Sequence, residues 1–132
     1  MQDRVSHARG WFRKGDSDLV TARRLVAAGE PYDTACFHAQ QAAEKYLKGL
    51  LAFHEQSIPL LHDLYRLERA CAAIEPRLVL SAPSLAGLTP YAVELRYDFD
   101  FWPEEETARE AIEACEQVRG AVLALVPGEA WP

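Results

Sequence analysis

Hydrophobic residues recur along this chain with the spacing of an α-helix. The first stripe steps by three or four residues and consists of Val5, Ala8, Phe12, Gly15, Leu19, Ala22 and Val26. This period places the whole stripe on one helix face. No segment of useful length alternates with period two, as a half-buried strand would. The pattern predicts five amphipathic helices, over residues 3–28, 32–55, 62–74, 84–97 and 104–126.

Residues that end or start helices lie between the predicted elements. Gly29 and Pro31 separate the first two helices, and Pro103 precedes the acidic first turn of the last one. Long amphipathic helices joined by short connections predict an all-α fold, an up-and-down bundle of four to five helices in a single domain over residues 1–132. Its core is expected to contain Leu19, Leu47, Leu50, Leu67, Leu88, Leu95, Ile112 and Val118.

Composition narrows the class of protein. The 132 residues suffice for one domain, and 49% hydrophobic with 26% charged residues is a globular balance. A net charge of −6 argues against a duplex-DNA binder, which needs a basic footprint. There is no run of 18 apolar residues, so no membrane span is expected. Cys36, Cys71 and Cys115 form no C-x-x-C motif, which favours buried free thiols in a cytoplasmic protein.

Common cofactor and catalytic motifs are missing from the sequence. Gly10 and Gly15 have the spacing of a phosphate-binding loop, but Asp16 follows where that loop needs lysine. No G-x-G-x-x-G, H-E-x-x-H or G-x-S-x-G occurs, and no two histidines stand four residues apart. We therefore expect neither a cofactor nor a metal.

The second predicted helix carries a row of polar residues beside its apolar stripe. His38, Gln41, Lys45 and Lys48 step by three, four and three residues and so share a face. Lysine and glutamine donors in one row suit an anionic or nucleotide-like ligand. The alternative is a solvated helix face with intrahelical pairs, such as Glu44 with Lys48.

Over nearly its whole length, the sequence resembles the HEPN family of small helical domains. The matching features are Trp11, Asp18-Leu19, the run Ala39-Gln40-Gln41-Ala42-Ala43-Glu44-Lys45, Leu47-Lys48, Leu50-Leu51, His62-Asp63-Leu64 and Arg96-Tyr97. The resemblance implies a bundle of four or five helices that pairs into dimers. It also implies a minimal nucleotidyltransferase as partner, in a toxin–antitoxin or nucleotide-handling pair, and a groove for a nucleotide such as ATP.

The resemblance extends the candidate ligand-binding row to two further positions. The full set is His38, Gln41, Lys45, Lys48, His62 and Arg96. Each addition has a structural alternative. His62 and Asp63 stand where a helix N-cap belongs, and Arg96 could pair with Asp98 or Asp63 instead of a phosphate.

Many HEPN relatives are metal-independent ribonucleases with an Arg-x(4–6)-His motif, and this sequence lacks it. The last histidine is His62, and no arginine is followed by a histidine at the required distance. We therefore assign no catalytic residue and expect a non-enzymatic module. The alternatives are a ribonuclease toxin with an atypical site and a non-catalytic homodimeric scaffold.

Large aromatic residues cluster where the chain leaves the fourth predicted helix. Phe99, Phe101 and Trp102 lie within four positions, and with Trp11 and Phe12 they exceed what one small core comfortably hides. Exposed apolar patches commonly mark association surfaces, so a homodimer is expected. The alternative is that these aromatics fold back over the open end of the bundle.

Overall fold

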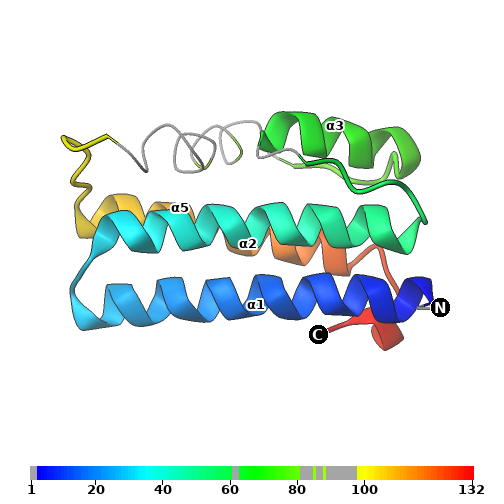
Figure 1. Ribbon diagram of the computed structural model, residues 1–132, viewed down its shortest axis with the longest axis horizontal. Coiled ribbons are helices and arrows are strands. Elements are labelled where there is room, and N and C mark those ends of the chain that lie inside the picture. The colour runs from blue at the N-terminus through cyan, green and yellow to red at the C-terminus, as the bar shows by residue number, and fades with distance from the viewer. Residues whose placement is uncertain (1–2, 61–62, 81–84, 86–87, 89–97) are drawn as a thin grey trace.

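A computed structural model describes residues 3–60, 63–80, 85, 88 and 98–132, and within these ranges the chain is helical without strands. The helices are α1 (Arg4–Ala28), α2 (Tyr32–Phe53), α3 (Leu64–Ile74) and α5 (Glu105–Leu123), followed by the 3-10 turn η3 (Gly128–Ala130). Figure 1 shows α1 and α2 side by side, α5 behind them, and α3 along the side of α2 away from α1. The predicted all-α bundle is confirmed.

Local side-chain chemistry fixes the ends of these helices. The Asp3 carboxylate accepts a hydrogen bond from the Ser6 amide at 2.8 Å and caps α1. Gly29 ends α1 in the left-handed region, with φ of 91°, where glycine is favoured. The Asp63 carboxylate caps α3 through the Tyr65 amide at 3.0 Å, so the capping role considered for this position is confirmed.

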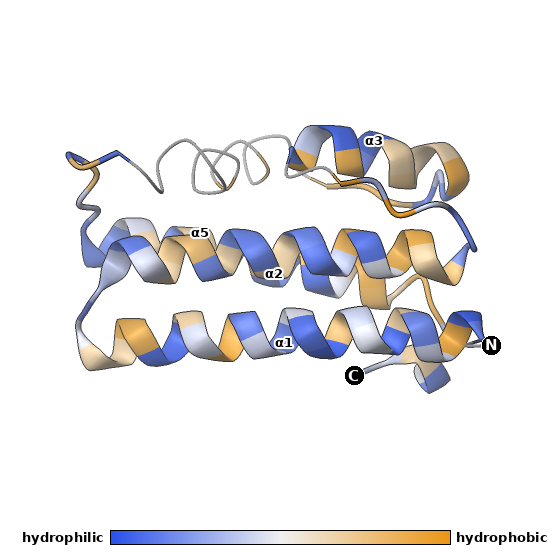
Figure 2. Cartoon of the chain, viewed as in Figure 1, coloured by the Kyte–Doolittle hydropathy of each residue, from blue (hydrophilic) through white to orange (hydrophobic). Residues whose placement is uncertain are grey.

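The antiparallel pair α1 and α2 forms the centre of the bundle. Apart from the half-buried Val5, the predicted α1 stripe is buried against α2. Two glycines let the helices approach closely. A Cβ atom at Gly15 would lie 2.8 Å from the Tyr46 ring, and one at Gly49 would overlap the Phe12 ring. Figure 2 shows that apolar and polar residues alternate along the helices, as amphipathic helices require.

The predicted core is confirmed wherever its residues are described. Seven of the eight residues are buried: Leu19, Leu47, Leu50, Leu67, Leu88, Ile112 and Val118. The eighth, Leu95, lies outside the described residues. All three cysteines are free and buried, as expected. Burial raises the pKa of the Cys36 thiol to about 12, so this side chain stays protonated at neutral pH.

The predicted fourth helix, residues 84–97, falls mostly outside the described residues. Leu85 and Leu88 are described, and both are helical and buried. The remainder of that helix stays a prediction. In the described part of the chain, no helix has the length and apolar content needed to cross a membrane.

Candidate functional site

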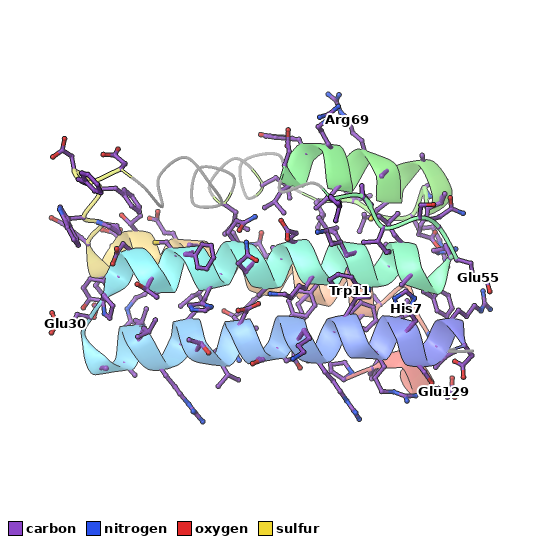
Figure 3. The ribbon with its side chains drawn as sticks, viewed as in Figure 1. His7, Trp11, Glu30, Glu55, Arg69 and Glu129 are labelled. Carbon is purple, nitrogen blue, oxygen red and sulfur yellow. The ribbon has the colours of Figure 1, made fainter. Side chains whose placement is uncertain are left out.

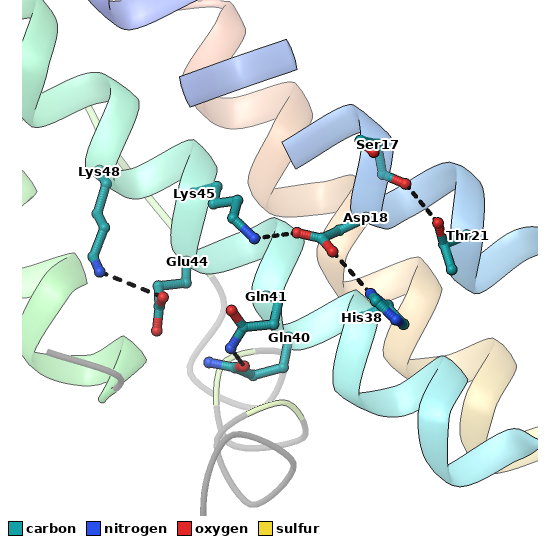
Figure 4. Close-up of polar contacts among 9 residues, drawn as sticks. All are labelled: Ser17, Asp18, Thr21, His38, Gln40, Gln41, Glu44, Lys45 and Lys48. Carbon is teal, nitrogen blue, oxygen red and sulfur yellow. Dashed lines mark hydrogen bonds and ion pairs between the residues drawn. The ribbon is translucent and has the colours of Figure 1, made fainter. Parts of the chain in front are cut away.

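The polar row predicted on α2 lies along one side of that helix, next to α1 (Figure 4). Of the six predicted ligand-binding residues, the four that form this row are described: His38, Gln41, Lys45 and Lys48. The other two, His62 and Arg96, lie outside the described residues, as does any pairing of Arg96. The described part of the site therefore consists of α2 side chains and the neighbours they contact.

Asp18 of α1 joins two side chains of the row, His38 and Lys45. Its Oδ1 lies 2.8 Å from His38 Nδ1, and its Oδ2 accepts a hydrogen bond from Lys45 Nζ. Figure 4 shows the carboxylate reaching between the two α2 side chains. The Asp18 side chain is only 15% exposed, so water screens these contacts weakly. This carboxylate fixes the orientation of the His38 ring and leaves Nε2 as its second polar atom.

Lys48 forms the pair with Glu44 that the sequence suggested, but the pair is buried. Lys48 Nζ lies 3.4 Å from Glu44 Oε2, and the two side chains are 8% and 5% exposed. The alternative of a solvated helix face is therefore wrong for Glu44 and Lys48. Intrahelical spacing predicts the pair, whereas its burial results from the packing around α2, which spacing alone does not encode.

Gln41 of the row contacts the preceding glutamine, Gln40. Gln41 Nε2 donates to Gln40 Oε1 at 2.8 Å, and Gln40 is fully buried. Buried polar groups are costly unless they are hydrogen-bonded, so such a cluster is uncommon in a purely structural core. The α2 face thus combines amide, imidazole and ammonium donors with two carboxylates.

The two lysines of the row keep unused hydrogen-bond donors, and Lys45 is the more accessible, with 24% of its side chain exposed against 8% for Lys48. A lysine ammonium carries three donors, and the contacts described for Lys45 and Lys48 each use one of them. Asp18 and Glu44 keep the lysines positioned and offset their charge. An anionic ligand would therefore meet oriented cations whose own desolvation is already partly compensated.

A second polar cluster joins α1, α2 and α5 beside the candidate site. Tyr46 Oη donates to Asp16 Oδ1 at 2.5 Å, and Arg119 Nε donates to the same oxygen at 2.9 Å. Burial opposes ionisation of Asp16, but hydrogen bonds from Arg119 and Tyr46 outweigh it and lower the Asp16 pKa. Burial and the Asp16 contact raise the Tyr46 pKa. We interpret this cluster as structural, joining α1, α2 and α5.

Sequence reasoning missed Asp18 as a site residue and Asp16, Tyr46 and Arg119 as a cluster. Asp18 carried two available signals: the Asp18-Leu19 pair is one of the features that resemble the HEPN family, and Asp18 directly precedes Leu19 at the edge of the α1 stripe. Residues at the edge of a buried stripe lie close to the helix that packs against that stripe. Among the described residues, no three His, Cys, Asp or Glu side chains converge as a metal site requires.

The aromatic segment after residue 97 is largely on the surface. Phe99 is 87% exposed and Trp102 is 74% exposed, so folding back over the bundle is wrong for these two. Phe12, expected to add to the aromatic excess, is instead fully buried in the core. Trp11 is half-buried beside His7.

Comparison with known proteins places the chain in a family. The sequence profile of the HEPN domain matches residues 8–125. The fold is similar to TT1696 from Thermus thermophilus, with a TM-score of 0.77 at 25% identity over 91% of this chain and 98% of that one. It is also similar to ST0689, described as an archaeal HEPN homologue, with a TM-score of 0.71 at 23% identity over 92% and 98%. No curated protein matches. The chain belongs to the HEPN domain family.

Proposed function

We propose that this protein is a non-enzymatic HEPN module that binds a nucleotide at the polar face of α2 and partners a minimal nucleotidyltransferase. The observation that carries the proposal is the polar row on α2 together with the polar side chains that it contacts. Lys48 of the row, its partner Glu44, and Gln40, the partner of Gln41, are all buried in the middle of a helix that otherwise supplies the apolar core.

A scaffold alone gives no reason for this row. Replacing a buried ion pair with apolar side chains of similar volume is commonly neutral or stabilising. The Glu44–Lys48 pair and the Asp18 contacts are therefore better explained by a ligand than by stability. This reasoning favours binding over a plain homodimeric scaffold.

The chemistry of the row suits a nucleotide. Lys45 and Lys48 provide ammonium donors for phosphate oxygens, and the Gln41 amide can pair with the edge of a base. The overall charge of −6 means that an anion must be attracted by a local arrangement of cations. Membership of the HEPN family supports the partner part of the proposal through the resemblance described above.

One contact favours a second candidate, a ribonuclease with an atypical site. His38 Nδ1 faces the Asp18 carboxylate at 2.8 Å, the arrangement by which a carboxylate orients a histidine for proton transfer. The sequence lacks the family's Arg-x(4–6)-His motif, so we rank this candidate second. Purified protein incubated with total RNA without added metal should leave the RNA intact. Cleavage that His38→Ala abolishes would reverse the ranking.

Calorimetric titration tests nucleotide binding. ATP is titrated into the wild type, Lys45→Ala and Arg69→Ala. Arg69 is an exposed residue of α3 that points away from the bundle (Figure 3), so its removal matches the charge change without touching the row. We expect Lys45→Ala to weaken ATP binding about tenfold or more and Arg69→Ala to leave it unchanged, because charge-assisted hydrogen bonds contribute about 1.5–3 kcal/mol. No binding at millimolar ATP, or equal loss in both variants, contradicts the proposal.

The partner is tested separately. A minimal nucleotidyltransferase encoded beside this gene would be co-expressed with the tagged protein and co-purified. A stoichiometric complex that survives size exclusion is expected. Failure of a folded neighbouring nucleotidyltransferase to co-purify removes the partner part while leaving the nucleotide part standing.

A further inference from the structure

A shallow pocket lies on α1, outside the predicted row of site residues. It has a volume of about 270 Å³ and is lined by His7, Gly10, Trp11 and Lys14. These positions share one face of the helix. Pockets for drug-sized ligands hold about 300–1,000 Å³, so this one suits a single flat ring system.

The indole of Trp11 is held in place from two helices. Its Nε1 donates to His7 Nε2 at 3.2 Å on α1. The Lys48 ammonium of α2 lies 5.8 Å from the ring centroid, within the range of a cation–π contact. In the view of Figure 3, His7 and Trp11 lie between α1 and α2, toward the end of the bundle that holds the N-terminus. A fixed aromatic ring is a favourable surface for a planar ligand.

Lys48 connects this pocket with the polar row. The same ammonium that lies over Trp11 is 3.4 Å from Glu44, within the row. Lys14, exposed at the pocket, adds a second cation. An aromatic wall next to two lysines fits a ligand that is planar at one end and anionic at the other.

We propose that the Trp11 pocket holds the base of the nucleotide and that its phosphates extend toward Lys14 and Lys48. This inference rests on the proposed nucleotide-binding function and moves the base from the Gln41 contact considered above to a pocket on α1. Contacts between bases and aromatic side chains tolerate any base, so binding should depend more on the presence of a base than on its identity.

Gly10 allows the pocket to be filled without disturbing the helix. A Cβ atom built there meets nothing within 4 Å, and the residue is exposed. Gly10→Leu would therefore place a side chain in the open pocket, and leucine is a better helix former than glycine. Gly120 on α5 is equally open and exposed but does not line the pocket, so Gly120→Leu is a matched control.

The experiment compares ATP with inorganic tripolyphosphate by calorimetry in the wild type, Gly10→Leu, Trp11→Leu and Gly120→Leu. Thermal melts first establish that each variant is folded. We expect ATP affinity to fall at least about fivefold in Gly10→Leu and Trp11→Leu and to stay unchanged in Gly120→Leu, given the strength of base–aromatic contacts. Tripolyphosphate should bind to the wild type more weakly than ATP does. Its affinity should be the same for Gly10→Leu as for the wild type.

The outcomes separate this inference from the proposed function. Wild-type ATP affinity in folded Gly10→Leu overturns the base pocket but leaves nucleotide binding intact. Equal affinity of the wild type for ATP and tripolyphosphate also overturns the base pocket and reduces the site to one that binds polyphosphate. If the wild type binds no ATP at millimolar concentration, both the pocket and the proposed function fail.

Discussion

At the scale of single residues, the decisive features are contacts across helices rather than positions within one. Asp18 contacts both His38 and Lys45, although neither is near it in sequence. Spacing along α2 predicts which side chains share a face, because helix geometry fixes it. It does not predict the carboxylate between them, because that depends on how α1 is rotated and shifted against α2.

Neutralising Asp18 should destabilise the protein. In Asp18→Asn, the partly buried Lys45 loses its counter-charge, and we expect a loss of about 1–3 kcal/mol of unfolding free energy. Urea denaturation measures the change, with Glu110→Gln on the exposed side of α5 as a control that should stay near the wild type. A loss below about 0.5 kcal/mol in Asp18→Asn would show that the contact contributes no more than a surface pair.

Glu75 gives the protein a specific sensitivity to acid. Two hydrogen bonds from Arg77, at 2.7 and 2.9 Å, lower the Glu75 pKa from 4.5 to about 2. Because the pKa of Glu75 is lower in the folded chain than in the unfolded chain, ionised Glu75 stabilises the fold at pH values above about 4.5. This contribution disappears as the pH falls from about 4.5 toward 2. Glu75→Gln should therefore be less stable than the wild type at pH 7 and approach it at pH 2. Urea melts at both pH values check this, and a constant difference would refute it.

At the scale of elements, the close pairing of α1 and α2 organises the molecule. Hydrophobic spacing predicts this pair because each helix must bury one stripe, and the buried positions of α1 match those predicted. The spacing counts Gly15 as one member of a stripe but gives no reason for a glycine there. That reason is the Tyr46 ring on the facing helix, which occupies the space of a side chain.

Substituting Gly49, which lies where α2 touches α1, should lower the unfolding free energy, whereas a glycine with free space around it should tolerate a side chain. Gly49→Ala forces the new methyl group into Phe12, and we expect a loss of about 1–3 kcal/mol. Gly120→Ala has open space and should gain up to about 1 kcal/mol from helix propensity. Chemical denaturation of both variants checks the contrast, and equal stability in the two would contradict the close packing of α1 and α2.

At the scale of the whole molecule, the described surface exposes two large aromatic side chains close together in one segment. Phe99 and Trp102 stand out from the segment between residue 97 and α5 (yellow in Figure 1) and are flanked by acidic residues. Aromatic residues are enriched in the cores of interfaces, so this segment is the surface we expect to associate. Sequence clustering predicts the aromatic excess, but only the fold separates the buried Phe12 from it.

The mass in solution tests this association. We expect light scattering coupled to size exclusion, at micromolar concentration, to give about twice the monomer mass of 14.8 kDa. Phe99→Ser with Trp102→Ser should shift the protein to the monomer without lowering its helix content, since both side chains lie outside the core. A wild-type mass near 14.8 kDa excludes a tight homodimer and leaves the aromatic segment for a different partner.

The central claim is that the polar face of α2 binds a nucleotide. Amide chemical shifts of the isotopically labelled protein, recorded during an ATP titration, locate binding without any substitution. The account predicts saturable shifts concentrated on residues 38–48 of α2 and 7–14 of α1, with α5 residues 105–113 unchanged. Shifts confined to α5, or none at millimolar ATP, would contradict it.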